Sequence, residues 1–341
     1  MLHTLYLGSY TKRESKGVHQ TILDTDKKEL SAVQLIAEVN SPTYITLNSD
    51  KSSLYTVSKE EEGAGLTAFT RQEDGQYKKR YSNTTEENTP CYIALDEENN
   101  LLFTASYHDG YVSVYKETES GIELTDRVQH VGSSVHENQD GPHVHYTDYT
   151  PDKKYLLVCD LGTDAVYSYS VSQQGKLKEV ARYQTKPGSG PRHLVFHPNG
   201  HTVYLLDELS SEVEVLEYQS EDGSLTYQSR ISMIPDSHTD FNSGAAIRVS
   251  ADGKFVYASN RGHNSIVVYK VADVFSLSLV EYKPSEGDFP RDFNLTPDQA
   301  FLVVGHQNSD QLTLFGRDDE TGKLNLLQKD VYAPECVCVT Y

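Results

Sequence analysis

Two arginines of the sequence occupy equivalent positions in different segments, each directly after a proline and before a short apolar stretch. Arg192 follows Pro191 in GPRHLVF, and Arg291 follows Pro290 in FPRDFNL. A guanidinium group presents its N–H donors in a rigid planar fork and binds carboxylates and phosphates bidentately. Because the chain has a formal net charge of −20 at pH 7, arginines at matched positions indicate a local anion-binding site.

A histidine at the start of one segment and a glutamate at the end of another could transfer a proton. His145 opens the segment HYTDYTPD, and Glu208 ends the segment TVYLLDE that follows Arg192. An imidazole has an ordinary pKa of about 6.5 and suits general-base catalysis at neutral pH. A pocket that combined a base, a carboxylate and arginines would support acid–base chemistry on a small anion.

Each of these residues also has a simpler explanation when it is taken alone. An arginine can pair with a neighbouring acid, as Arg291 could with Asp292, and a single histidine such as His145 often only satisfies structural hydrogen bonds. The functional interpretation therefore depends on an architecture that brings distant residues to one place.

Such an architecture is indicated by a repeat of roughly fifty residues that occurs seven times. Each unit begins with a turn and usually a proline, and four short strands follow. The unit starts are SPTYITLNSD, TPCYIALDEE, GPHVHYTDYTPD, GPRHLVFHPN, GAAIRVSADG, FPRDFNLTPD and APECVCVTY. Strand-only repeats of this length are typical of propellers with one four-stranded sheet per blade. We therefore predict an all-β, seven-bladed β-propeller, formed as a single domain by residues 1–341.

The two ends of the chain are predicted to share one blade. The last unit, Pro334–Tyr341, contains only a first strand, and Leu2–Leu7 has the pattern of its missing second strand. Such a closure leaves no open sheet edge between the first and last blades. The sixth unit departs from the repeat, because Val274–Leu277 stands where other units have a glycine turn. There we expect either a short helical turn or a longer loop.

In a propeller, the first strand of each blade lines the central channel and the second runs antiparallel to it. The start of one and the end of the other therefore meet at the same channel mouth. This rule predicts that one mouth gathers His145, Arg192, Glu208, Arg261 and Arg291. Further candidates for contacts with an anionic ligand are Arg248, His143, Asn260 and Gln307. Two long polar connections, 131–145 and 233–245, lead into first strands and are expected to cover this mouth.

Composition narrows the possible partners. The acidic excess disfavours nucleic acid and anionic membranes, which bind clustered lysines and arginines. The four cysteines include no CxxC pair and are expected to be buried free thiols of a reducing compartment. The sequence has no apolar run long enough for a membrane span and no signal-peptide pattern at Met1, so a cytoplasmic location is expected. We predict no metal, since His136, His143 and His145 lack carboxylates at a recognisable spacing.

Four segments together resemble the seven-bladed lactonase family. They are GPHVHYTDYTPDKKYLLVCDLGTDAVYSY, GPRHLVFHPNGHTVYLLDELSSEVEV, AAIRVSADGKFVYASNRGHNSIVVY and FPRDFNLTPDQAFLVVGHQNSDQL. The family includes bacterial propeller-type 6-phosphogluconolactonases and fungal carboxy-muconate cycloisomerases. The resemblance covers essentially the whole chain, and it implies metal-independent, cofactor-free chemistry on a lactone at the channel mouth.

The resemblance also implies roles for individual residues. A histidine, an arginine and a glutamate of the fungal branch match His145, Arg192 and Glu208. Either His145 or Glu208 would then be the general base, and Arg192 would stabilise the oxyanion. Arg261 and Arg291 would hold a phosphate, with Asn260 and Gln307 on sugar hydroxyls. Many relatives have an acidic residue between the positions of Ala246 and Ile247, where this sequence has none.

The expected function is hydrolysis of 6-phospho-D-glucono-1,5-lactone in the pentose phosphate pathway. The expected partner is thus a small anionic sugar lactone, and the protein could be a monomer or a homodimer. Two alternatives remain open at this stage. One is a lactonising cycloisomerase that acts on muconate-like diacids, and the other is a non-catalytic propeller that binds a protein partner.

Overall fold

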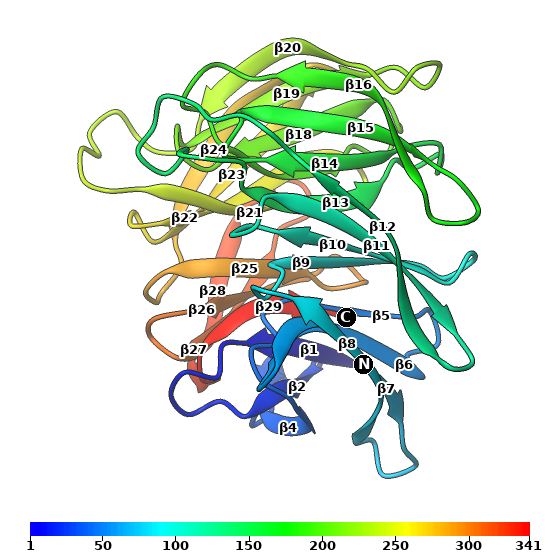
Figure 1. Cartoon of the computed structure of the whole chain (residues 1–341). Coiled ribbons are helices and arrows are strands. Elements are labelled where there is room, and N and C mark those ends of the chain that lie inside the picture. Colours follow the sequence, from blue (N-terminus) through cyan, green and yellow to red (C-terminus); the bar gives the residue numbers. More distant parts are fainter. The chain divides into compact units, whose positions relative to one another are not determined.

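The computed structural model describes all residues, 1–341, and its regular elements are all β-strands (Figure 1). The strands form seven sheets, six of four strands and one of five, with antiparallel neighbours. Each sheet corresponds to one predicted repeat, so the prediction of an all-β fold with seven blades is confirmed. No helix of the chain has the length and apolar character that crossing a membrane requires.

The chain divides into two compact units. The first contains Met1–Leu35, His193–Glu217 and Tyr227–Tyr341, and the second contains Ile36–Arg192 and Tyr218–Thr226.

Three sheets belong to the second unit, and within each the strands pair in chain order. Their strands are β5 (Ile45–Leu47), β6 (Ser53–Glu60), β7 (Gly63–Arg71) and β8 (Tyr77–Glu86); β9 (Tyr92–Asp96), β10 (Leu101–Ser106), β11 (Tyr111–Thr118) and β12 (Gly121–Gln129); and β13 (Val144–Tyr149), β14 (Leu156–Asp160), β15 (Ala165–Val171) and β16 (Leu177–Gln184).

The next three sheets follow the same order. Their strands are β17 (Pro191–Phe196), β18 (Thr202–Asp207), β19 (Glu212–Tyr218) and β20 (Leu225–Ser232); β21 (Ser243–Val249), β22 (Phe255–Arg261), β23 (Ser265–Asp273) and β24 (Ser276–Pro284); and β25 (Pro290–Leu295), β26 (Phe301–His306), β27 (Gln311–Arg317) and β28 (Leu324–Tyr332).

The remaining sheet joins the two ends of the chain. Its order is β29 (Cys336–Thr340), β1 (Leu2–Ser9), β2 (Gly17–Asp24) and β3 (Glu29–Leu30), and β4 (Gln34–Glu38) also pairs with β2. In Figure 1 the red strand β29 lies beside the dark blue strand β1, and Leu7 is the register partner of Val339. The predicted shared blade is confirmed.

Apolar layers between successive sheets form the core of the first unit. One layer contains Leu5 and Leu7 of β1 with Val303 of β26, and another contains Tyr257 of β22 with Phe293 of β25. Because side chains alternate between the two faces of a strand, each sheet contributes to the layers on both sides. Gly305 has a specific packing role, since a Cβ there would lie 2.7 Å from Cys336 Sγ.

The sixth repeat differs from its prediction. The segment Val274–Leu277 is neither a helical turn nor a long loop, because only Val274 and Phe275 separate β23 from β24. The Asp273 side chain accepts a hydrogen bond from the Phe275 amide (2.9 Å), and the pairing has an irregularity between Val271 and Asp273. An Asp side chain and a bulge thus stand where most of the corresponding hairpins have a glycine.

The two long connections are loops, as predicted: β12 ends at Gln129 and β13 begins at Val144, while β20 ends at Ser232 and β21 begins at Ser243. The four cysteines are free, and three of them are buried, as the composition predicted; Cys91 is half-buried.

Candidate functional site

The candidate residues fall into two groups, one in each compact unit. Glu208, Arg248, Asn260, Arg261, Arg291 and Gln307 belong to the first unit, and His143, His145 and Arg192 belong to the second. Convergence of the two groups on one channel mouth stays a prediction, and each group has its own geometry.

Glu208, Ser243 and Arg261 form a closed cluster in the first unit. Arg261 ends β22 and is the register partner of Ser243, which begins β21. The Arg261 Nη2 donates to Ser243 Oγ (2.6 Å) and to the Gly244 carbonyl (2.7 Å), and it lies 2.9 Å from Glu208 Oε1. Ser243 Oγ in turn donates to Glu208 Oε1 (3.0 Å). The carboxylate of Glu208 is therefore held in a fixed orientation.

Burial sets the electrostatics of this cluster. Arg261 is only 5% exposed, and its burial lowers the pKa of the guanidinium below the ordinary value. The charge of Glu208 opposes this shift, whereas the nearby charge of Arg291 adds to it. The buried charge of Arg261 is thus neutralised by Glu208, and removing either residue would leave the other with an unpaired charge.

Arg291 has different partners. Its Nη1 donates to Gln307 Oε1 (3.2 Å), and its guanidinium carbon lies 5.7 Å from the ring centroid of Tyr10. Arg291 forms no ion pair with a carboxylate. The expected alternative of a pair with Asp292 is wrong, because that carboxylate binds Arg248 Nη2 (2.9 Å) and accepts from the Val339 amide (2.8 Å). Neighbouring residues of a strand point to opposite faces, which separates the two side chains.

Two other candidates of the first unit have structural partners. Arg248 is neutralised by the buried carboxylate of Asp292. Asn260 is fully buried, and its amide donates to the Met233 carbonyl (2.7 Å) and to Ser265 Oγ (3.2 Å). Asn260 therefore stabilises the connection that follows β20, and its side chain is not accessible to a sugar hydroxyl.

In the second unit, Tyr107 contacts both candidate histidines. The His143 ring stacks on Tyr107 with centroids 4.4 Å apart, and the His145 ring meets it edge to face at 5.8 Å. His143 Nδ1 donates to the Tyr107 carbonyl (2.8 Å), and Nε2 lies 3.2 Å from Asp140. An anion at His143 would compete with that carboxylate. His145 is 4% exposed and Arg192 2%.

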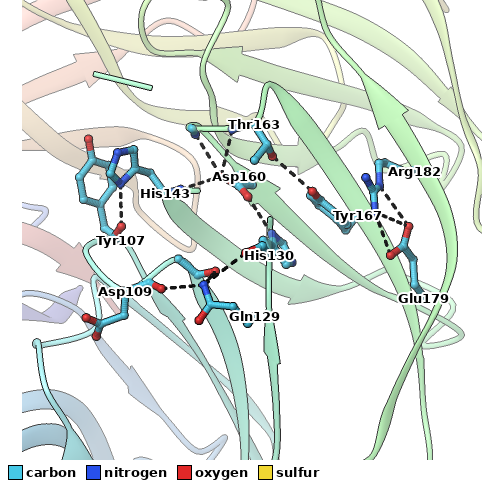
Figure 2. A network of polar contacts seen from close by, with 12 residues as sticks. Tyr107, Asp109, Gln129, His130, His143, Asp160, Thr163, Tyr167, Glu179 and Arg182 are labelled. Carbon is cyan, nitrogen blue, oxygen red and sulfur yellow. Dashed lines mark hydrogen bonds and ion pairs between the residues drawn. The ribbon is translucent and has the colours of Figure 1, made fainter. Parts of the chain in front are cut away.

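Asp160, at the end of β14, fixes the segment that carries these histidines (Figure 2). Its Oδ1 accepts from the amides of His143 (2.7 Å), Gly162 (3.0 Å) and Thr163 (3.3 Å). Its Oδ2 accepts from His130 Nδ1 (2.8 Å). A buried carboxylate with these four donors needs no cation beside it, and it positions the backbone that leads into β13.

Lys12 and Arg13 were not among the candidates of the sequence analysis, although they line a cavity together with the candidate Gln307. A cavity of about 300 Å³ is lined by Tyr10, Lys12, Arg13, Gln307, Asn308 and Glu335. The segment YTKR, residues 10–13, directly follows β1, the second strand of its blade, where the matching segments of other repeats carry Glu208 and Arg261. This equivalence is the sequence signal that could have identified Lys12 and Arg13.

No group of three or more His, Cys, Asp or Glu side chains has an arrangement that could hold a metal ion. Side chains of these types that lie within hydrogen-bonding distance of one another form pairs, such as His130 with Asp160 and His143 with Asp140.

Comparisons with known proteins show the family. Residues 4–341 match the family model described as "Lactonase, 7-bladed beta-propeller". A solved structure of a Lactobacillus plantarum protein has a TM-score of 0.97 and 44% identity over 99% of both chains. A Bacillus subtilis protein named 6-phosphogluconolactonase is 38% identical over 98% of this chain and 97% of its own.

A further solved structure, the periplasmic gluconolactonase of Pseudomonas aeruginosa, has a TM-score of 0.94 and 30% identity, covering 100% of this chain and 99% of that one. With a family match over nearly the whole length and relatives at 30–44% identity over at least 97% of each chain, the chain belongs to the seven-bladed β-propeller lactonase family.

Proposed function

We propose that this protein hydrolyses 6-phospho-D-glucono-1,5-lactone to 6-phosphogluconate, in the cytoplasm and as a step of the pentose phosphate pathway. Membership of the lactonase family and the Bacillus subtilis relative named 6-phosphogluconolactonase support the reaction. The observation in this chain that carries the proposal is Arg291, a cation without a carboxylate partner beside the Glu208–Arg261 pair. In a protein with a net charge of −20, such a cation favours an anionic substrate.

The proposed reaction adds water across the lactone ester. The water oxygen bonds to the carbonyl carbon, and a general base takes one proton from that water. The bond from this carbon to the ring oxygen then breaks, and the ring oxygen takes up a proton to become a hydroxyl group. Arg192 is proposed to stabilise the negative oxygen of the tetrahedral intermediate.

The geometry favours His145 over Glu208 as the base. The Glu208 carboxylate already accepts from Ser243 and pairs with the buried Arg261. Protonating it would leave a buried guanidinium without its counter-charge, which is costly. We therefore assign Glu208 the role of orienting water or substrate, and Arg261 the role of holding Glu208 rather than the phosphate.

The proposed partner is thus a small anionic sugar lactone. Nucleic acid and membrane surfaces are not proposed as partners, and the reaction as written uses no cofactor or metal. It would operate equally in a monomer or a homodimer.

The test is acceleration of lactone hydrolysis over the spontaneous rate, with and without EDTA. Freshly generated 6-phosphogluconolactone should be hydrolysed faster in both cases. Unphosphorylated glucono-1,5-lactone is the comparison substrate, because one relative is named a gluconolactonase. If neither lactone is hydrolysed faster, the proposal is contradicted, and muconate-type lactones become the substrates to test.

His145→Ala tests the assignment of the base. The variant should lower kcat by about 10²–10⁴, the usual contribution of a general base. His201→Ala is the matched control, because His201 is exposed and only its backbone amide donates a hydrogen bond. A loss in His145→Ala below about tenfold, together with a larger loss in Glu208→Gln, would move the role to Glu208.

A further inference from the structure

The cavity of about 300 Å³ in the first unit is formed where the two ends of the chain meet. Tyr10, Lys12 and Arg13 come from the loop after β1, Gln307 and Asn308 follow β26, and Glu335 precedes β29. Its volume is at the lower end of the range for small-molecule sites, which is about 300–1,000 Å³. It therefore suits one polar substituent of a ligand with its hydrating water.

The cations at and beside this cavity differ in how they are neutralised. Arg13 lies 2.7 Å from Asp310 and 3.8 Å from Glu335, and Arg261 lies 2.9 Å from Glu208. Lys12 and Arg291, by contrast, form no ion pair. The positive charge that remains for a ligand is therefore that of these two residues.

Lys12 and Arg291 contact the same aromatic ring. Lys12 Nζ lies 4.4 Å from the ring centroid of Tyr10, and the guanidinium carbon of Arg291 lies 5.7 Å from it. Cation–π contacts of this kind position a charge without neutralising it. Both cations thus lie against the same side chain, and a carboxylate neutralises neither of them.

The loop that carries Lys12 is fixed from the other end of the chain. Glu335 is only 3% exposed, and its carboxylate accepts from the amides of Lys12 (3.0 Å), Arg13 (2.9 Å) and Ser15 (3.3 Å). Charge-assisted bonds to several successive amides are strong. The backbone at Lys12 is therefore held in place even though the Lys12 side chain is exposed.

We propose that Lys12 and Arg291, which both contact the Tyr10 ring, bind the phosphate monoester of the substrate and set the preference for a phosphorylated over an unphosphorylated lactone. The proposal rests on the proposed lactonase function and adds to it a residue, Lys12, and a location for the phosphate. This location lies near Glu208, because the charges of both Arg291 and Glu208 influence the pKa of Arg261.

The experiment compares kcat/KM for 6-phosphogluconolactone with kcat/KM for glucono-1,5-lactone, two substrates that differ only in the phosphate. Lys12→Met should lower the ratio of these values by about tenfold, the size expected for one charged contact. Lys12→Arg keeps the charge and should retain most of the ratio. Lys16→Met is the matched control from the same exposed loop, and its ratio should equal that of the wild type.

A ratio that changes by less than about twofold in Lys12→Met would overturn the proposal, since a charged contact contributes more than that. Arg291→Met should lower the ratio as well, and the double variant should show an effect different from the sum of the single ones if both residues bind one phosphate. Additive effects would contradict a shared ligand.

If the proposed lactonase function itself is wrong, the wild-type protein will not accelerate hydrolysis of either substrate. Calorimetric titration with 6-phosphogluconate, a stable phosphate monoester, then tests the subsite alone. Binding that Lys12→Met loses and Lys16→Met keeps would support it, and no binding by the wild type would overturn it.

Discussion

Asp148, in β13 close to Tyr92, shows how the interior changes a single ionisable group. Its burial raises the pKa of the carboxyl group from 3.8 to about 6, and the hydrogen bond from the Tyr149 amide (2.8 Å) only partly opposes this. The folded protein therefore keeps a proton that the unfolded chain releases. Stability should fall as the pH rises from about 4 to about 6 and remain reduced above that range.

Asp148→Asn removes this penalty, because an amide has no charge to bury and its oxygen still accepts from the Tyr149 amide. We expect a gain of about 2 kcal/mol in the free energy of unfolding at pH 7 and almost none at pH 4. Urea unfolding at both pH values measures the difference. A gain that is equal at both would show that the effect does not arise from ionisation.

Asp152→Asn is the contrasting variant from the same unit. Burial there is outweighed by hydrogen bonds from Thr150, the Lys154 amide and Tyr218, which bring the pKa of Asp152 below its ordinary value. Its carboxylate contributes stability that is present at neutral pH and lost in acid. The substitution should therefore lower stability at pH 7, opposite in sign to Asp148→Asn.

At the scale of elements, the loop between β1 and β2 depends on one carboxylate. Glu335→Ala would leave the amides of Lys12 and Arg13 without their acceptor and remove the charge beside Arg13. We expect a loss of about 2–4 kcal/mol in the free energy of unfolding, the range for buried charge-assisted bonds. Hydrogen exchange of the Lys12 and Arg13 amides should also accelerate.

The neighbouring Glu14→Ala is the control for this loop, since Glu14 is exposed and forms no ion pair. It should change stability by no more than about 0.5 kcal/mol. Unchanged exchange of the Lys12 amide in Glu335→Ala would contradict the view that Glu335 holds the loop.

The sequence predicted the strands because their pattern is local. A turn, usually a proline and alternating apolar residues within a few positions specify each first strand. Because the same pattern recurs in every repeat, each strand supports the assignment of the others. The sixth hairpin was mispredicted because Asp273 and a bulge perform the role that glycine performs elsewhere.

Side-chain partners were harder to predict, because they join residues distant in sequence. The sequence left a pair between Asp292 and its neighbour Arg291 as an alternative, but Asp292 binds Arg248 and the Val339 amide. Lys12 was overlooked because the carboxylate that fixes its backbone is Glu335, at the other end of the chain. Asn260 was correctly placed at a strand end, yet its bonds to Met233 and Ser265 remove it from the surface.

At the scale of the whole molecule, closure of the seventh sheet joins the first strand of the chain, β1, to the last, β29. Val339 of β29 pairs with Leu7 of β1 and is 1% exposed within an apolar layer of the first unit. By contrast, Val57 of β6 is fully buried and pairs with Leu66 of the adjacent strand. A contact between chain ends costs more loop-closure entropy than a hairpin contact, so it should form late in folding.

Val339→Ala and Val57→Ala remove the same atoms from buried strands and should each cost about 2 kcal/mol. The kinetics should differ, because a late contact affects unfolding and an early one affects folding. In Val339→Ala we expect unfolding to accelerate by about thirtyfold with refolding nearly unchanged, whereas Val57→Ala should slow refolding. Stopped-flow fluorescence of the tyrosines in urea measures both rates. Equal slowing of refolding in the two variants would mean that the chain ends already meet in the transition state, and that closure guides assembly of the sheets rather than completing it.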